Sequence, residues 1–276
     1  MSIRIDSAFE RLASRGGKGF IPFITAGDPD PETTLELIVM LAEHGSTVIE
    51  LGVPFTDPMA DGPVIQRSSQ RALENGHSDL ASILRIVKEA RKRTEVPIIL
   101  FGYLNPFLAY GFERLKQDAW TAGVDGFLIT DVVDEEFAEL SRELGSSDLD
   151  LISLIAPTTT DERIEKIVRS ARGFIYAVSR TGVTGQGSEM RDSAEELVIR
   201  IRTATNLPVA VGFGISTAGQ VSDVLRFADA AVVGSGIVKV IETAAEGSVV
   251  DDVRHFVSNL LSNPKDNEAS GKSVAT

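Results

Sequence analysis

Three carboxylates within the segment 48–66 have the types and spacing needed for proton transfer. Glu50 lies in an apolar, partly β-branched run at 47–53 that predicts a buried strand, and Asp57 and Asp61 follow in a proline-rich loop. A charge is costly to bury without a partner. Carboxyl groups held in different environments can divide the tasks of acid and base between them. The segment therefore predicts acid–base chemistry.

The direction of Glu50 follows from the alternation of side chains along a strand. Ile49 and Leu51 suit packing against helices, so Glu50 is expected to point the other way, into a barrel near its top. Desolvation there would raise the pKa of its carboxyl. The alternative is a structural glutamate paired with Arg or Lys, but the neighbouring strand runs contain no such cation. Spacing alone does not choose between Asp57 and Asp61, because Asp beside Pro or Gly is also a common turn former.

Eight short apolar runs alternate with helical patterns along the chain. The predicted strands cover 20–26, 47–53, 97–102, 126–130, 149–155, 174–179, 208–213 and 230–233. Helical patterns follow Asp30 and Asp79 and recur near 113–122, 134–144, 161–171, 193–204 and 217–227. Strands that are apolar throughout and separated by helices indicate a parallel sheet covered by helices. Eight such units favour a single (β/α)8 barrel.

The ends of the chain and the helix starts add detail to this architecture. An extra helix is expected at 3–13, covering the barrel floor, and a last helix at 249–261. The barrel domain is expected to span 1–262, followed by a polar, disordered tail at 263–276. Asp30 and Asp79 are predicted helix N-caps. Thr159 with Glu162 and Thr217 with Gln220 have the spacing of capping boxes.

Composition excludes several classes of function. The formal charge of −13 argues against a general affinity for nucleic acid or acidic membranes. The chain has no cysteine, which removes disulfides, thiol catalysis and thiolate metal sites. Its three histidines, His44, His77 and His255, have no metal-ligand partner at useful spacing, so no metal site is predicted. The first ten residues do not resemble a secretory signal, and a cytoplasmic location is expected.

Glycine clusters follow three of the late strands, at 182–185, 212–214 and 234–236. In a barrel the active site is built from the loops at the carboxyl ends of the strands. Bare backbone N–H groups and a helix N-terminus after strands seven and eight commonly bind phosphate. Simple turn glycines explain any single cluster equally well. The glycine-rich loop 180–190 is either a mobile lid over the site or a disordered segment without function.

The segment 49–63, which reads I-E-L-G-V-P-F-T-D-P-M-A-D-G-P, closely resembles the signature of the tryptophan synthase α subunit family. The segments 179–185 and 212–216 resemble the family's other two motifs, in the same order, and the likeness extends from about residue 20 through the last helix. The resemblance implies a (β/α)8 barrel that cleaves indole-3-glycerol phosphate to indole and glyceraldehyde 3-phosphate. It also implies that the chain carries no cofactor and passes indole to a pyridoxal-phosphate β subunit in an α2β2 complex.

The resemblance further implies roles for individual residues. Glu50 resembles the general acid/base that protonates the indole carbon being released, Asp61 the carboxylate that accepts the indole N–H, and Tyr176 a tyrosine that assists them. Thr184 resembles the lid residue that closes onto the catalytic aspartate, and Asp57 a loop residue that communicates with the β subunit. The implied indole pocket is lined by Phe23, Phe127, Thr130 and Phe213, and the implied phosphate cradle consists of Gly185, Gly214, Gly234 and Ser235.

Two other readings stay open at this point. One is a different phosphate-binding barrel, such as a sugar-phosphate isomerase or a stand-alone indole-producing lyase. The other is a non-catalytic α subunit that binds ligand and only activates its partner, although such a regulator need not keep both Glu50 and Asp61. A Schiff-base aldolase is disfavoured because no strand-borne lysine lies near the barrel mouth, Lys239 being inside a predicted helix.

Overall fold

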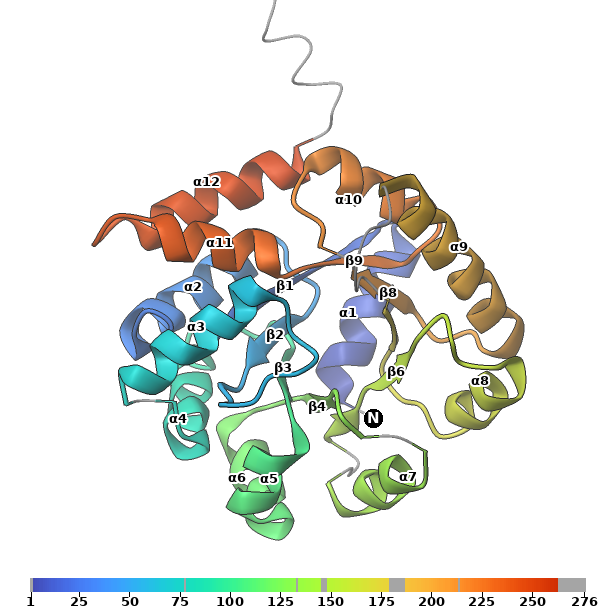
Figure 1. Ribbon diagram of the computed structural model, residues 1–276, viewed down its shortest axis with the longest axis horizontal. Helices are drawn as coiled ribbons and strands as arrows, with labels where there is room; N and C mark the ends of the chain where they lie inside the picture. Colours follow the sequence, from blue (N-terminus) through green and yellow to red (C-terminus); the bar gives the residue numbers. More distant parts are fainter. Residues whose placement is uncertain are drawn as a thin grey trace, which may run out of the picture.

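The computed structural model describes residues 2–76, 78–132, 134–144, 148–178, 187–212 and 214–262. Within these ranges nine parallel strands form one sheet, in the order β5-β4-β3-β2-β1-β9-β8-β7-β6. They are β1 (Gly19–Thr25), β2 (Ile49–Gly52), β3 (Ile98–Gly102), β4 (Gly126–Ile129), β5 (Asp150–Leu151), β6 (Ser153–Ile155), β7 (Ile175–Val178), β8 (Val209–Gly212) and β9 (Ala230–Val233). Helices surround this sheet (Figure 1), and the predicted (β/α)8 architecture is confirmed.

The fifth predicted strand, 149–155, is divided in the structure. Ile152 separates β5, which pairs with β4, from β6, which pairs with β7. The backbone N–H of Ile152 still donates a hydrogen bond to the carbonyl of Phe127 at 2.8 Å. The two short strands therefore occupy one position of an eight-membered barrel, and the chain itself joins the two ends of the sheet.

The described helices fall into those that were predicted and two that were not. They are α1 (Ile3–Ser14), α2 (Pro31–Glu43), α3 (Pro63–Glu74), α4 (Leu80–Ala90), α5 (Leu104–Tyr110), α6 (Phe112–Ala122), α7 (Asp134–Glu143), α8 (Asp161–Val168), α9 (Gly187–Ala204), α10 (Ala218–Leu225), α11 (Ser235–Thr243) and α12 (Val249–Leu261). The new ones, α3 and α5, lie in segments for which the sequence analysis predicted no helix. None of the helices in the described ranges has the length and apolar character needed to cross a membrane.

Most of the predicted helix starts are confirmed. The side chains of Asp30 and Asp79 accept hydrogen bonds from the first turns of α2 and α4, and Thr217 forms a complete capping box with Gln220. The capping box predicted at Thr159 is wrong by one residue. The N-cap of α8 is Thr160, and the Thr159 hydroxyl instead accepts from the N–H of Ala156 at 3.2 Å.

The hydrophobic core has two layers, one on each face of the sheet. The outer layer lies between the strands and the surrounding helices, and the inner layer fills the barrel. Ile5 and Phe9 of α1 belong to the inner layer, where Phe9 packs on Phe174 with ring centroids 5.5 Å apart. Figure 1 shows α1 behind the strands and inside the ring of helices. The N-terminal helix thus covers one end of the barrel, as predicted, and the opposite end is left for the site. The predicted tail at 263–276 lies outside the described residues.

Candidate active site

Glu50 points into the barrel, as the alternation of its strand predicts. Its neighbours Ile49 and Leu51 belong to the outer core, and Glu50 is paired in register with Phe23 of β1 and Ile99 of β3. Glu50 is only 1% exposed, and its Oε1 atom has no hydrogen-bond partner among the described residues. Burial without a cation raises the pKa of this carboxyl well above its ordinary value. Burial therefore favours the protonated form of the Glu50 carboxyl.

Asp61 is held beside the barrel mouth by a tyrosine that the sequence did not identify. The hydroxyl of Tyr103 donates to Asp61 Oδ2 at 3.0 Å and accepts from the N–H of Ala60 at 2.9 Å. The Tyr103 ring packs on Phe55, with centroids 5.2 Å apart. Burial raises the pKa of Asp61 to about 6, and the hydrogen bond from Tyr103 works in the opposite direction. The Asp61 carboxyl is consequently ionised at neutral pH, whereas burial favours the protonated form of Glu50.

Tyr176 of β7 lies within electrostatic reach of both carboxylates. Burial raises the pKa of its hydroxyl well above the ordinary value, and the negative charges of Glu50 and Asp61 raise it further. A Cβ atom on Gly212 would lie 2.7 Å from the Tyr176 oxygen, so glycine at 212 leaves the space that this hydroxyl occupies. The three predicted catalytic side chains, carried by two strands and a loop, are thus brought together at one mouth of the barrel.

Aromatic rings form the wall around Glu50. Phe23 contacts Phe101 edge-on with centroids 5.2 Å apart, and Phe101 lies 6.5 Å from Tyr176 by the same measure. A Cβ atom on Gly52 would lie 2.5 Å from Phe23 Cζ, so the ring can sit above Glu50 only because residue 52 is glycine. The predicted pocket residue Phe23 is therefore at the site, and Phe101 joins it there.

Phe127 is not brought to the mouth. Its ring lies in the outer core against Phe107, with centroids 5.7 Å apart, whereas Leu128 is in the inner layer. Alternation along β4 makes it impossible for Phe127 and Thr130 to share a face. Thr130, at the end of this strand, donates from Oγ1 to the carbonyl of Gly102 at 3.2 Å, next to Tyr103. The expectation that Phe127 lines the pocket is corrected; Leu128, paired in register with Phe101, faces the barrel interior instead.

The backbone for an anion site is present at the start of α11. Gly234 is the N-cap and Ser235 the first residue, and no side chain caps the helix. Gly214 has φ +59°, a backbone conformation that residues other than glycine rarely adopt. A Cβ atom on Gly236 would lie 3.1 Å from the carbonyl oxygen of Ile215, so glycine lets the loop after β8 approach the start of α11. Two predicted phosphate-binding segments therefore meet at the mouth.

Comparison with known proteins decides the family. The family model described as "Tryptophan synthase alpha chain" matches residues 9–264. The chain is 48% identical to the tryptophan synthase alpha chain of Citrifermentans bemidjiense, over 93% of this chain and 96% of the relative. It is 49% identical to that of Geobacter sulfurreducens, over 93% and 97%. The chain belongs to the tryptophan synthase alpha chain family.

Solved structures of this family have the same fold. The tryptophan synthase subunit alpha of Legionella pneumophila str. Paris is 37% identical and superposes with a TM-score of 0.86, covering 94% of this chain and 97% of that one. A chain of the tryptophan synthase a2b2 complex of Pyrococcus furiosus is 38% identical with a TM-score of 0.81, covering 88% and 97%. The structural likeness thus extends over nearly the whole α chain.

Several predicted residues lie outside the described part of this α chain or at its edge. Thr184, Gly185 and Phe213 are not among the described residues. Of the predicted lid 180–190, the last four residues belong to α9, which starts at Gly187 rather than at the predicted position 193. The expected loop is accordingly shorter at its carboxyl end than the glycine pattern suggested.

Asp57 lies on the exposed rim of the mouth, away from Glu50. Its Oδ2 accepts from the hydroxyl of Thr56 at 2.6 Å. Two apolar side chains on the same rim are unusually exposed, Met59 at 92% and Leu108 at 56%.

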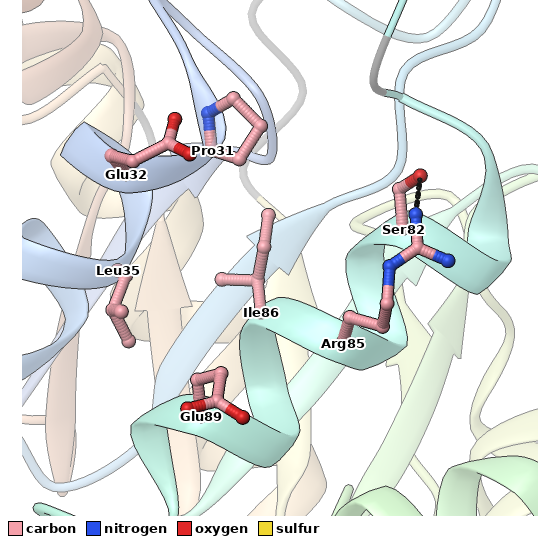
Figure 2. Close-up of a pocket in the computed structure, with 7 residues that line it drawn as sticks. All are labelled: Pro31, Glu32, Leu35, Ser82, Arg85, Ile86 and Glu89. Carbon is pink, nitrogen blue, oxygen red and sulfur yellow. Dashed lines mark hydrogen bonds between the residues drawn. The ribbon is translucent and has the colours of Figure 1, made fainter.

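An open groove elsewhere on the α chain does not include any predicted site residue. It lies between α2 and α4 and is lined by Pro31, Glu32, Leu35, Ser82, Arg85, Ile86 and Glu89 (Figure 2). Arg85 crosses one side of the groove to donate to the Ser82 hydroxyl at 2.7 Å. In the described part of the chain, no group of three or more His, Asp or Glu side chains is arranged to hold a metal ion.

Proposed function

We propose that this α chain cleaves indole-3-glycerol phosphate to indole and glyceraldehyde 3-phosphate by a retro-aldol reaction, using Glu50, Asp61 and Tyr176. The observation that carries the proposal is the placement of two carboxyl groups in different environments at one barrel mouth: Glu50 is fully buried without a hydrogen-bond partner at Oε1, whereas the half-buried Asp61 accepts a hydrogen bond from Tyr103. Burial favours a proton on Glu50, whereas Asp61, with a pKa of about 6, is ionised at neutral pH. A reaction that needs both a proton donor and an anion finds both here.

Glu50 and Asp61 can account for the proton transfers and the charge stabilisation that the reaction requires. Glu50 donates its proton to the indole ring carbon that will be released, and the ionised Asp61 accepts the indole N–H and stabilises the positive charge that develops on the ring. The glycerol hydroxyl then loses its proton, a carbonyl forms, and the bond to the ring carbon breaks with its electron pair returning to the ring. The carboxylate of Glu50 is the base that takes the hydroxyl proton, which restores the acid for the next turnover.

Binding of the substrate would use the rest of the mouth. Phe23, Phe101 and Leu128 supply an apolar wall for the indole ring, and the hydroxyl of Tyr176 is within electrostatic reach of both carboxylates. The start of α11, with Gly214, Gly234 and Ser235, would take the phosphate on backbone N–H groups and the positive end of the helix dipole. The resemblance adds Gly185 to the phosphate site, Phe213 to the indole pocket and Thr184 as the lid residue that closes onto Asp61.

The proposed reaction produces indole for a partner. The Pyrococcus furiosus relative is described as part of an a2b2 complex, and we assign the same kind of partner, a tryptophan synthase β subunit, to this chain. The pyridoxal phosphate of such a complex is expected in the β subunit. Asp57, with Met59 and Leu108 exposed on the same rim, is the proposed contact. We also propose that the chain carries out this role in the cytoplasm.

Incubation of the purified chain with indole-3-glycerol phosphate tests the function directly. Indole should form, faster in the presence of a β subunit than in its absence. Absence of indole under both conditions would refute the proposed reaction. Retention of inorganic phosphate binding by an inactive chain would instead favour a non-catalytic activator of the β subunit.

A further inference from the structure

Two helices at the barrel mouth start at opposite ends of the proposed substrate site. α3 starts at Pro63, shortly after Asp61, and α11 starts at Ser235 in the proposed phosphate cradle. The two helices pack against each other and against β1, side by side in Figure 1. How α3 docks on α11 therefore sets the distance between the carboxylate that meets the indole and the backbone that meets the phosphate.

Apolar packing contributes little to this docking. The buried residues of α3 are Ser68, Ser69 and Ala72, which offer little apolar surface to remove from water. Ser68 shares a hydrogen bond of 2.6 Å with the hydroxyl of Thr25 at the end of β1. Polar contacts must therefore carry much of the attachment of α3 to the barrel.

Glu242, in the last turn of α11, forms ion pairs with three basic side chains. Arg67 of α3 approaches it with both Nε and Nη2, at 2.5 and 3.0 Å, and Arg71 of α3 adds a contact at 3.2 Å. Lys239 donates from the preceding turn of α11 at 2.7 Å. Arg67 and Lys239 lower the pKa of the Glu242 carboxyl, which favours its charged form.

Arg71 extends the network to the loop after β1. Its guanidinium forks onto the carboxylate of Asp28, with Nε to Oδ1 at 2.9 Å and Nη2 to Oδ2 at 2.7 Å. Asp28 is only 1% exposed. A two-pronged contact of this kind fixes orientation as well as distance. One side chain of α3 is thus held by a buried carboxylate beneath it and by Glu242 of α11 beside it.

We propose that Glu242 and Arg71 are positioning residues that lock α3 to α11, so that phosphate bound at the start of α11 fixes the loop that carries Asp61. This inference rests on the proposed function, because both ends of the coupling belong to the proposed substrate site. The link is short: Gln66, in the first turn of α3, donates from Nε2 to the carbonyl of Asp61 at 2.9 Å. A shift of α3 relative to α11 is therefore passed directly to Asp61.

Hydrogen–deuterium exchange of the loop amides at 56–61, with and without inorganic phosphate, tests the coupling in the full chain. In the parent protein phosphate should slow this exchange at least threefold. In Glu242→Gln, phosphate should still bind with a dissociation constant within about threefold of the parent value, but the slowing should fall by half or more. In turnover of indole-3-glycerol phosphate, kcat should fall about tenfold while KM changes less than threefold, because the phosphate end still binds and the indole end is misplaced.

Glu36→Gln is the matched control. It breaks a two-pronged contact of the same type, between the more exposed Glu36 and Arg93 on the outer wall, and should leave the loop response and kcat at the parent values. If Glu242→Gln folds poorly by circular dichroism, Arg67→Met removes the two-pronged part of the helix–helix contact from an exposed position and keeps both contacts of Arg71, with Asp28 and with Glu242.

The outcomes separate the inference from the function on which it rests. Equal slowing of loop exchange in Glu242→Gln and the parent would overturn the coupling, as would a parent loop that ignores bound phosphate. A parent chain that yields no indole would refute the lyase function and leave the exchange result to be judged independently. If Glu242→Gln lowers the free energy of unfolding but phosphate still slows the exchange of the loop amides as in the parent, the ion pairs have only a structural role and the coupling is overturned.

Discussion

Removal of the Tyr103 hydroxyl should move the acid limb of the pH–rate profile. The proposed role of Asp61 requires its ionised form, and with a pKa of about 6 it is about nine-tenths ionised at pH 7 and about one-tenth ionised at pH 5. Activity of the parent chain should therefore fall about tenfold between those two values. The hydroxyl of Tyr103 donates to this carboxylate at 3.0 Å, which favours the charged form.

The size of the shift follows from the strength of that bond. A hydrogen bond to a charged acceptor contributes about 1.5–3 kcal/mol, and one pKa unit corresponds to about 1.4 kcal/mol. Tyr103→Phe should therefore raise the pKa of Asp61 from about 6 to about 7–8. At pH 7 the value of kcat/KM should be about two to ten times lower than that of the parent, and the difference should close above about pH 9.

The assay is indole formation from indole-3-glycerol phosphate over pH 5–9, with Tyr110→Phe as control. Tyr110 also donates to a carboxylate, Asp118 Oδ2 at 2.6 Å, on the rim between α5 and α6, so the control removes the same type of bond outside the site. The phosphate of the substrate titrates identically in all three proteins and cancels in the comparison. An acid limb that stays at the parent pH in Tyr103→Phe, or a rate lowered equally at every pH, would refute the reasoning.

Three further changes test other parts of the structure. Glu50→Gln should lower kcat at least a thousandfold, because the transferable proton is lost, while inorganic phosphate binds as in the parent when measured by calorimetry. Indole release at the parent rate would contradict this. Gly52→Ala places a Cβ atom 2.5 Å from Phe23 Cζ and should cost about 1–3 kcal/mol of unfolding free energy as well as activity, measured by urea denaturation and turnover. Asp125→Asn removes the negative charge that pairs with Arg91 at 2.6 Å and should cost about 3–5 kcal/mol of unfolding free energy, measured by urea denaturation, with kcat nearly unchanged. A large fall in kcat with full stability would contradict a purely structural role for this position on the barrel floor.

The sequence predicts the direction of Glu50 because that direction depends only on local alternation. The pattern at 47–53 decides which face is apolar, and the inward glutamate follows. The same alternation contains the correction for Phe127, since Phe127 and Thr130 have opposite parity along one strand. Assigning both by resemblance to a family overlooked a constraint that the residues themselves supply.

Other features depend on contacts that no local pattern reveals. Tyr103 is far from Asp61 in the chain, and their hydrogen bond exists only because β2 and β3 are neighbours in the sheet; a tyrosine directly after the neighbouring strand was the available signal. The helix α3 was missed because its buried face consists of serines and alanine rather than a periodic apolar stripe. In α5, Pro106 lies within the first turn, where a helix tolerates it.

The different charges of the two carboxylates follow from the elements that carry them. Glu50 stands on a strand inside the barrel, where each backbone donor is used by the neighbouring strand and only side chains could offer a bond; none reaches its Oε1 from the described residues. Asp61 lies on a loop, whose backbone is not constrained by a sheet, and its carboxylate accepts a hydrogen bond from the hydroxyl of Tyr103. The position of Glu50 on a strand therefore favours its protonated form, and the position of Asp61 on a loop favours its ionised form. The proposed reaction requires this difference, because one ring atom must be protonated and the ring N–H must donate a hydrogen bond to an anion.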